Sequence, residues 1–222
     1  MMVPLLLTAC KVNNSAKVQQ QAEENRLLKG FERIEISGGL EVRYTQADSF
    51  SVVVKAPNEV AENVVTRVDS NKLVVTLKDG SVLRLGGDDN DDVTVFVSSP
   101  DLLGVELKGS GDFECNRLLD TDNLDIRLQG SGDIEFADIV CDRINVSLLG
   151  SGDIEVKNVK TLQSAIELNG SGDIQMRFTD SGDITSLLTG SGDITLEGNV
   201  KNHRSEVRGS GDLNTRRLTV RK

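Results

Sequence analysis

The sequence predicts an all-β protein, a right-handed parallel β-helix or β-solenoid with rungs of about 20 residues. Three observations support this: a recurring four-residue phrase, an apolar/polar alternation around it, and a repeat unit too short to fold alone. The phrase Gly-Ser-Gly-Asp occurs six times, at steps of 21, 20, 20, 20 and 19 residues. The copies stand at Gly109–Asp112, Gly130–Asp133, Gly150–Asp153, Gly170–Asp173, Gly190–Asp193 and Gly209–Asp212.

Each repeat carries the period-two pattern of a half-buried strand on both sides of the phrase. Directly after the Asp stand Phe113, Ile134, Ile154, Ile174, Ile194 and Leu213. Two residues before the first Gly stand Leu107, Leu128, Leu148, Leu168, Leu188 and Val207. The residues that flank these columns are mostly polar. We therefore expect each unit to be a strand, a tight turn, a second strand and a looser corner.

The glycines of the phrase are assigned a structural role, because glycine permits a positive φ or a close approach of backbones at a bend. They are Gly109, Gly111, Gly130, Gly132, Gly150, Gly152, Gly170, Gly172, Gly190, Gly192, Gly209 and Gly211. Since a 20-residue unit buries too few side chains to fold by itself, neighbouring rungs must stack, about 4.8 Å apart. The winding is expected to be right-handed, as parallel crossovers are.

Residues 1–10, MMVPLLLTAC, look like the end of a bacterial lipoprotein signal peptide, with Leu7–Cys10 as the lipobox. Such a signal implies cleavage before Cys10, acylation of its thiol and a lipid anchor in the membrane. The alternative is a frayed apolar N-terminus. Only nine residues precede Cys10 and none is basic, which departs from a full signal peptide and leaves the position of the true start open.

Residues 11–30 are rich in Gln, Asn and Glu and are expected to form a flexible tether, with a trace of helical character at Gln19–Leu28. Residues 31–104 are expected to form the irregular N-terminal part of the solenoid, a small strand-rich cap region. In it, Ser37-Gly38-Gly39 resembles a degenerate turn of a first rung.

Between two predicted strands, Val60, Val64 and Val65 have helical spacing after a candidate cap at Asn58, so Asn58–Arg67 is predicted to be a short helix over the solenoid end. The strands predicted in this part are Ser51–Lys55, Lys72–Lys78 and Asp92–Ser98. Residues 105–222 then form the regular solenoid.

Composition excludes several classes of function. A net charge of −10 argues against nucleic-acid binding, which needs clustered Lys and Arg. No apolar run reaches the ~20 residues of a membrane helix. An aromatic content of 3% with no Trp disfavours sugar binding through stacked aromatic rings. The three cysteines do not suggest a disulfide framework: Cys115 falls in an inward column and Cys141 in a corner, where a bridge between them is not favoured.

The repeated aspartates should line up along one edge of the solenoid. Each carboxylate could accept N–H bonds within its own turn, as in Asx-turns. Alternatively, Ca²⁺ could lie between rungs, and the candidate ligands are then Asp133, Asp153, Asp173 and Asp193. The acidic segment Asp88–Asp92 does not fit an EF-hand loop, because Val93 and Ser99 stand where Gly and Glu are needed.

No catalytic constellation is evident, so we expect no enzyme activity and no cofactor. The single histidine, His203, has Ser205, Ser210 and Asp212 nearby in sequence but no nucleophile elbow. The Gly-x-Gly pairs precede a strand, unlike a nucleotide-binding loop. A polysaccharide-active β-helix enzyme is the alternative; a cleft with convergent Asp, Lys and Arg on one face would favour it.

The motif F-x-x-I-x-I-S-G-G-L-x-V at Phe31–Val42, the strand Leu73–Leu77, the segment Val93–Pro100 and the tandem rungs together resemble the head GIN domain family of auto-transporter adhesins, found in Bacteroidetes envelope lipoproteins. The resemblance implies a right-handed parallel β-helix in the cell envelope and no catalytic residues. We therefore expect a non-catalytic outer-membrane lipoprotein, periplasmic or surface-facing, that serves as an adhesion, binding or structural module. Its partner would be an envelope protein or glycan; the ligand and the oligomeric state are open.

Overall fold

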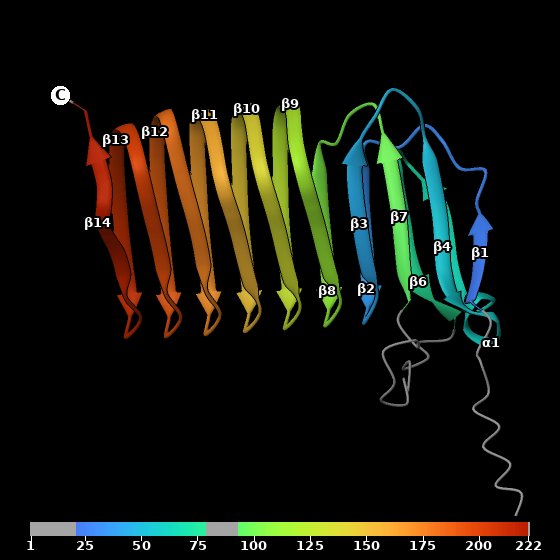
Figure 1. The fold of residues 1–222 in the computed structure, drawn as a ribbon. Coiled ribbons are helices and arrows are strands. Elements are labelled where there is room, and N and C mark those ends of the chain that lie inside the picture. Colours follow the sequence, from blue (N-terminus) through green and yellow to red (C-terminus); the bar gives the residue numbers. More distant parts are fainter. Residues whose placement is uncertain (1–20, 79–92, 222) are drawn as a thin grey trace, which may run out of the picture.

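The chain folds as a row of stacked β-coils with an irregular region at the N-terminal end (Figure 1). The computed structural model describes residues 21–78 and 93–221. The irregular region comprises β1 Gln21–Asn25, β2 Arg33–Gly38, β3 Glu41–Gln46, β4 Ser51–Pro57, α1 Asn58–Ala61, β5 Val64–Asp69, β6 Lys72–Leu77 and β7 Thr94–Ser99. The coils follow as β8 Gly104–Gly109, β9 Asp112–Gly130, β10 Asp133–Gly150, β11 Asp153–Gly170, β12 Ile174–Gly190, β13 Ile194–Gly209 and β14 Leu213–Val220.

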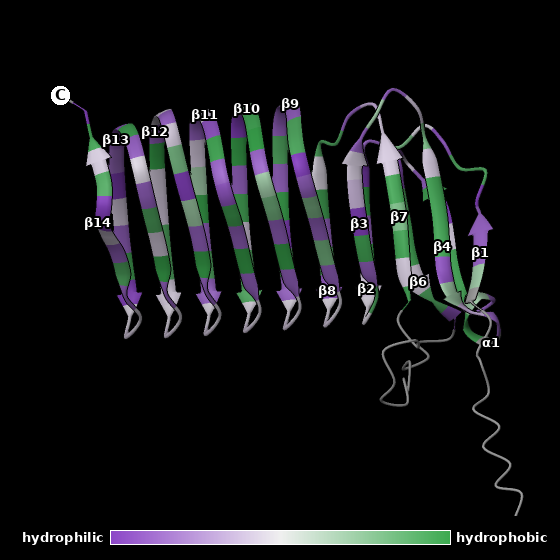
Figure 2. Ribbon diagram, in the orientation of Figure 1, coloured by the Kyte–Doolittle hydropathy of each residue, from purple (hydrophilic) through white to green (hydrophobic). Residues whose placement is uncertain are grey.

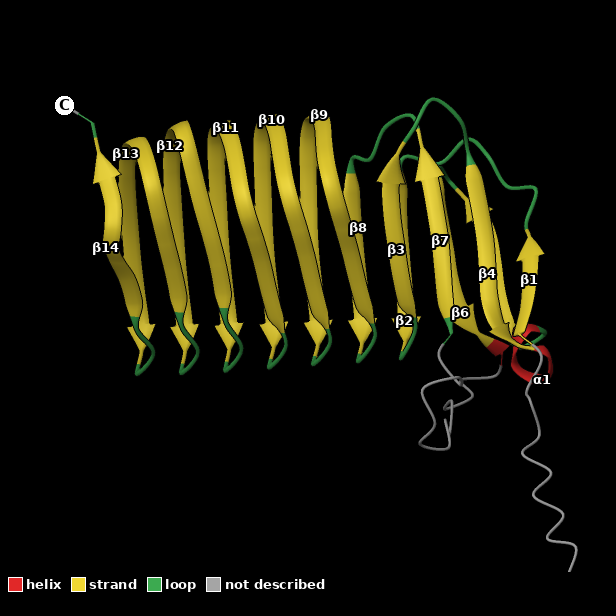
Figure 3. Ribbon diagram, viewed as in Figure 1, coloured by secondary structure: helices red, strands yellow, loops and turns green. Residues whose placement is uncertain are grey.

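The predicted parallel solenoid is confirmed. Each coil pairs in parallel with the next, so that Ile134 lies beside Ile154 and Leu148 beside Leu168. The corner expected to be loose is instead continuous strand, as the unbroken yellow ribbons of Figure 3 show. The ladder passes through this corner at Ile139–Val159, because buried and exposed residues keep alternating there and the next coil follows the same path.

One continuous hydrophobic core fills the space inside the coils. The stacked residues Ile134, Ile154 and Ile174 are at most 1% exposed. Figure 2 shows the resulting alternation of apolar and polar bands along the strands. An aromatic stack of Tyr44, Phe113 and Phe136 joins the irregular region to the regular coils, with ring centroids 6.3 and 5.2 Å apart.

The Gly-Ser-Gly turns need glycine because the turns of neighbouring coils nearly touch. Gly130 has φ +143°, and a Cβ there would lie 2.1 Å from the carbonyl oxygen of Gly109. A Cβ on Gly132 would lie 1.8 Å from the carbonyl oxygen of Gly111. A side-chain carbon cannot lie this close to a backbone oxygen. The close approach of backbones predicted for these glycines is therefore the reason that both positions require glycine.

The segment Ser37-Gly38-Gly39 does form the turn of a first coil. On one side of it β2 pairs in parallel with β8, with Gly38 beside Gly109. On the other side β3 pairs in parallel with β9, with Val42 beside Phe113. Farther toward the N-terminal end the pairing becomes antiparallel, β4 with β7 and β5 with β6.

The structure corrects two local expectations for the N-terminal part, one in the type of element and the other in the length of a helix. Within Gln19–Leu28, where helical character was expected, Gln21–Asn25 form strand β1, which pairs antiparallel with β4. These five residues were also expected to belong to the tether. The helix expected over Asn58–Arg67 is limited to α1, whose N-cap residue is Pro57 without a side-chain hydrogen bond. The residues after it form β5, since β-branched side chains favour the strand that β6 completes.

The last coil departs from the predicted columns. β14 pairs only with the part of β13 that ends at Val200. The rest of β13 pairs with β12 on one side, and no described strand lies along its other side. Val207, which was expected to be inward and buried, is 45% exposed. The lipobox at Cys10, most of the predicted tether and the acidic segment Asp88–Asp92 lie outside the described residues. In the described ranges no helix has the length and apolarity needed to cross a bilayer.

Candidate binding groove on the outer face of the coils

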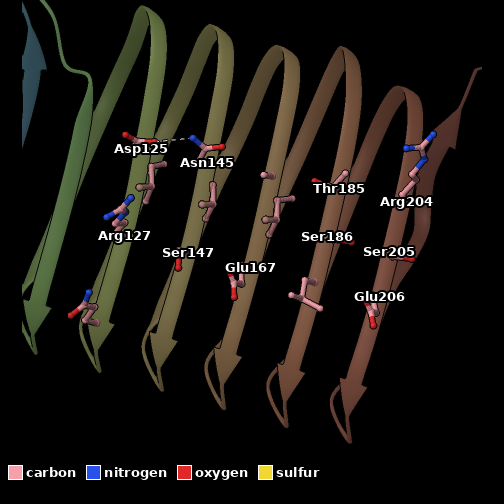
Figure 4. A pocket seen from close by; sticks show the side chains of 16 residues that line it. Asp125, Arg127, Asn145, Ser147, Glu167, Thr185, Ser186, Arg204, Ser205 and Glu206 are labelled. Carbon is pink, nitrogen blue, oxygen red and sulfur yellow. Dashed lines mark hydrogen bonds between the residues drawn. The ribbon is translucent and has the colours of Figure 1, made fainter.

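A groove of about 740 Å³ crosses the outer face of five successive coils, β9 to β13 (Figure 4). It lies on the sheet formed by the second half of each coil. Ile126, Val146 and Ile166 point inward there and are buried, so their neighbours in sequence point out into the groove. The same alternation that builds the core therefore builds the groove.

Parallel register arranges the groove side chains in two rows across the coils. The first row is Asp125, Asn145, Ala165, Thr185 and Arg204, and the second is Arg127, Ser147, Glu167, Leu187 and Glu206. The short side chains of Ala165 and Ser147 lie among longer ones, and this difference in length helps to hollow the face. Neighbours within a row are separated by the spacing of paired strands, about 4.8 Å.

Asp125 is a fixed anion at one end of the groove. Its carboxylate accepts hydrogen bonds from Asn145 Nδ2 at 2.8 Å and from Arg33 Nη2 at 3.0 Å. Partial burial alone would raise its pKa, but these two hydrogen bonds and the charges of Arg33 and Arg127 together hold the pKa of Asp125 below its usual value. Asp125 therefore stays ionised and oriented by its partners.

The predicted aspartate ladder is present at the turns, but its hydrogen bonds differ from the expected local ones. From Asp112 to Asp193, the Oδ1 atom of each Asp accepts the backbone N–H of the Asp in the next coil. The donor–acceptor pairs are Asp133 to Asp112 (3.2 Å), Asp153 to Asp133 (3.1 Å), Asp173 to Asp153 (3.0 Å), Asp193 to Asp173 (3.1 Å) and Asp212 to Asp193 (2.9 Å). The ladder thus joins coils, whereas an Asx-turn would stay within one.

The pKa of the first carboxylate in this ladder is shifted. The pKa of Asp112 is raised, mainly by burial and to a lesser extent by the charges of Asp133 and Glu41, although the Asp133 N–H opposes this. In the described parts of the chain no three His, Cys, Asp or Glu side chains gather into a group able to hold a metal ion. Ca²⁺ binding by Asp133, Asp153, Asp173 and Asp193 stays a prediction.

His203, which stands near Ser205 and Ser210 in sequence, forms a hydrogen bond with a serine of the preceding coil instead. His203 Nε2 lies 2.9 Å from the Oγ of Ser186, a buried residue. Burial lowers the pKa of His203. Sequence proximity did not suggest this pair, because the parallel register brings together residues 17 positions apart.

Two glutamates meet on the opposite face of the solenoid. Lys157 Nζ lies 3.1 Å from Glu135 and 3.9 Å from Glu155. Burial and the neighbouring Glu135 raise the pKa of Glu155, while the charge of Lys157 lowers it. A lysine between stacked carboxylates explains how like charges are tolerated at strand spacing.

Cys115 and Cys141 are buried free thiols, so no disulfide joins them. Burial raises the pKa of the Cys115 thiol to about 11, which keeps it protonated near neutral pH.

Sequence reasoning missed a second hollow, on the face that bears Glu135. Its lining includes the aromatic ring of Phe96. The pattern Val95-Phe96-Val97 could have predicted an outward-facing aromatic ring here, because the two valines are buried and the residue between them must point outward.

These features define the chain as a parallel β-solenoid with polar, hollowed outer faces. A family model described as "Putative auto-transporter adhesin, head GIN domain" matches residues 30–158 and 146–222. The chain belongs to this family.

Solved structures agree on the fold. The chain is similar to a "putative adhesin" from Bacteroides fragilis NCTC 9343, with 21% identity and a TM-score of 0.73 over 88% of this chain and 97% of that one. A "putative adhesin" from Parabacteroides distasonis ATCC 8503 is 15% identical, with a TM-score of 0.68 over 89% of this chain and 97% of that one.

A "putative lipid binding protein" from the same Parabacteroides strain is 19% identical, with a TM-score of 0.56 over 87% of this chain and 96% of that one. Comparison with curated proteins gives no match. The family and the first two structures are named for adhesion, a non-enzymatic role at the cell envelope or surface.

Proposed function

We propose that this chain is a non-catalytic binding module of the bacterial cell envelope that presents its groove to an extended, polar polymer, an envelope glycan or a segment of an envelope protein. The observation that carries the proposal is the continuity of the groove across five coils. Its lining side chains stand at the same two positions of each coil, one strand spacing apart, so a linear ligand can meet several coils in succession.

The chemistry of the groove supports a polar ligand. Its lining holds charges of both signs, with Arg127 and Arg204 beside Asp125, Glu167 and Glu206, and no aromatic ring. Protein interfaces with a tight apolar core rely on aromatic anchors, which this groove lacks. Hydrogen bonds and paired charges distributed along the coils suit a ligand that is itself hydrophilic along its length.

The arrangement of carboxylates favours binding over polysaccharide cleavage. A glycosidase needs two carboxyl groups flanking one bond, and one of them must stay protonated. In the groove Asp125 is held ionised by Asn145 and Arg33. Glu167 and Glu206 stand in the same row but are separated by a whole coil.

The anchor proposed for this module is a lipid on Cys10, in an outer-membrane lipoprotein that faces the periplasm or the surface. Metabolic labelling with an alkyne-bearing fatty acid tests it. Wild-type chain should acquire the label and the Cys10→Ser variant should not. Equal labelling of both would contradict a lipid at this position.

Binding is tested with glycan and envelope-protein arrays, using the full chain carrying Cys10→Ser. In a second variant, Ser147→Trp fills the centre of the groove. Leu162→Trp is its control, because Leu162 is already 64% exposed and does not line the groove. A ligand lost only with Ser147→Trp supports the proposal. Cleavage of an arrayed polysaccharide by the unmodified groove would contradict it.

A further inference from the structure

The hollow around Phe96 lies on the opposite face from the groove, where the irregular region meets the first regular coil. Its volume is about 310 Å³, at the lower end of the range for small-ligand sites. It exists because β3 and β9 pair only from Glu41–Asp112 to Arg43–Glu114 and then separate. Beyond that point no ladder closes the space between the two strands.

A β-bulge in β9 shapes one side of the hollow. Cys115 lies beside Phe136, but the next paired residues are Leu118 and Asp138, so Asn116 and Arg117 both oppose Ala137. This extra residue accounts for the single 21-residue step in the repeat. Bulges redirect side chains, and Asn116 and Arg117 are exposed and line the hollow.

The far end of the gap is held by Gln46. Its Nε2 donates to the carbonyl oxygens of Asp120 at 2.8 Å and Pro100 at 2.9 Å, and its Oε1 accepts the N–H of Asp120 at 2.9 Å. These three bonds fix β3 relative to β9 where their own ladder has ended. The hollow is therefore formed before any ligand arrives.

The lining combines one aromatic ring with hydrogen-bonding groups. Phe96 is half-buried, whereas Phe31, Phe113, Phe136 and Phe178 are buried in the core. Ser51, Ser98 and Asn116 surround the ring with hydroxyl and amide groups. Ser98 Oγ donates to the carbonyl oxygen of Ser49 at 2.9 Å, which leaves its lone pairs to accept.

The charged side chains near the ring differ in whether they already have an ion-pair partner. Arg43 is bound to Glu41 at 2.6 Å and to Glu114 at 3.3 Å. Lys55 Nζ lies over one face of the Phe96 ring, 5.4 Å from its centre, and is not among the residues that line the hollow. Arg117 has no ion-pair partner within the described ranges, and its guanidinium can meet a carboxylate in two parallel hydrogen bonds.

We propose that this hollow binds an acidic sugar, a uronic acid residue of a glycan. The apolar face of the pyranose ring packs on Phe96, the carboxylate pairs with Arg117, and the ring hydroxyls bond Ser51, Ser98 and Asn116. A neutral sugar would leave Arg117 without a counterion. A dianionic phosphate would meet the carboxylate of Glu114 at close range. The site is independent of the groove proposed above.

Calorimetric titration of the full chain carrying Cys10→Ser with trigalacturonic acid tests the inference. The trimethyl ester of the same trisaccharide is the uncharged comparison. We expect Arg117→Gln and Phe96→Leu each to weaken binding of the acid at least tenfold, and the ester to bind the unmodified hollow comparably weakly. Arg117 is exposed, so its variant keeps the fold even if Phe96→Leu does not.

The matched control is Arg216→Gln, which removes the same charge from an exposed position of β14 that lines neither the groove nor the hollow and should leave affinity for the acid unchanged. Arg127→Gln, in the groove on the other face, tests whether the sugar binds there instead. Three outcomes overturn the inference: no binding of the acid at millimolar concentration, equal binding of acid and ester, or loss of binding with Arg127→Gln but not with Arg117→Gln. The last result would place the sugar in the groove and leave the proposed function intact.

Discussion

The backbone N–H of Asp153 donates to the Oδ1 atom of Asp133, one coil away, at 3.1 Å. Asp153 Oδ1 in turn accepts the N–H of Asp173 at 3.0 Å. Each of the four inner aspartates, from Asp133 to Asp193, is thus a donor to one neighbouring aspartate and an acceptor for the other. From Asp112 to Asp193 each negative charge of the ladder is offset by a backbone N–H of the next coil, which explains why a row of carboxylates at strand spacing does not push the coils apart.

The ladder predicts different outcomes for two substitutions at Asp153. Asp153→Ala removes the acceptor for the N–H of Asp173 and should lower the free energy of unfolding by about 1 kcal/mol. Asp153→Asn keeps an oxygen acceptor and relieves repulsion between neighbours, so its stability should stay close to wild type. Urea titration followed by circular dichroism measures both. Equal losses for Ala and Asn would mean that the charge itself, rather than the hydrogen bond, is what matters.

Chelation separates the hydrogen-bonded ladder from the Ca²⁺ alternative. Because the carboxylates of Asp133, Asp153 and Asp173 already accept N–H bonds between coils, we expect EDTA to leave the melting temperature unchanged. Added Ca²⁺ should likewise have no effect beyond that of an equal ionic strength of NaCl. A melting temperature that drops with EDTA and recovers with Ca²⁺ would support ions between the rungs instead.

The turn glycines give the sharpest stability prediction. In Gly132→Ala the new methyl group collides with the carbonyl oxygen of Gly111, and the coils must separate locally. We expect a loss of more than about 3 kcal/mol, or failure to fold, as for severe overpacking. Gly39→Ser is the control, because its Cβ would lie 3.5 Å from Ser110 Oγ and the residue has no strained φ. A soluble Gly132→Ala protein with wild-type stability would contradict this account of the turns.

The regular coils were predictable because one local rule repeats. Ile134, Ile154 and Ile174 stand at the same position of each unit, and parallel stacking in register is the arrangement that buries them all. The N-terminal part lacks this redundancy. β1 is defined by its pairing with β4, some 30 residues away, and nothing within its own five residues indicates that partner. Val60, Val64 and Val65 fit helical spacing, but antiparallel pairing with β6 determines the outcome for the last two.

The candidate sites were harder to predict than the core for a related reason. Outward positions vary freely from coil to coil, so Ser147 and Ala165 look unremarkable until the register places them side by side with longer residues. Two signals for the Phe96 hollow were nevertheless in the sequence. Phe96 stands between two inward valines, and the one 21-residue step marks the bulge at Arg117.

Two buried hydroxyls in one coil should respond to mutation with opposite signs. Ser164 Oγ is buried without a hydrogen-bond partner, between Ile144 and Ile184 of the adjacent coils. Ser164→Ala should therefore raise the free energy of unfolding by about 1 kcal/mol. Thr161 Oγ1 lies 3.1 Å from the carbonyl oxygen of Asp142 and 3.0 Å from that of Gln163 and donates its one proton to these acceptors in alternation, so Thr161→Val should lower the free energy of unfolding by about 1–2 kcal/mol. Thermal unfolding of both variants measures the difference, and destabilisation by Ser164→Ala would show that its hydroxyl is satisfied in solution.

Glu35 links three strands and should make stability depend on pH. Its carboxylate on β2 meets Lys72 of β6 and Lys108 of β8, the latter at 3.1 Å. The hydrogen bond from Lys72 is the main cause of a lowered pKa of Glu35; burial opposes this, and Lys108 adds to the lowering. Because the unfolded chain takes up this proton first on acidification, the stability that Glu35 contributes is complete above its unfolded pKa of about 4.3 and is lost as pH falls through the lower folded value.

Glu35→Gln should therefore destabilise the protein by up to about 1 kcal/mol at pH 7, and the difference from wild type should close near pH 3. Glu155→Gln provides the opposite case, because burial and Glu135 raise the pKa of Glu155. There the folded chain takes up the proton first, so the ionised carboxylate costs stability at pH 7. The substitution should stabilise at neutral pH, with a gain that disappears as pH falls below the unfolded pKa. Urea titrations of both variants from pH 7 to 3 measure these trends, and parallel curves for wild type and Glu35→Gln would rule out the coupling of Glu35 to its two lysines.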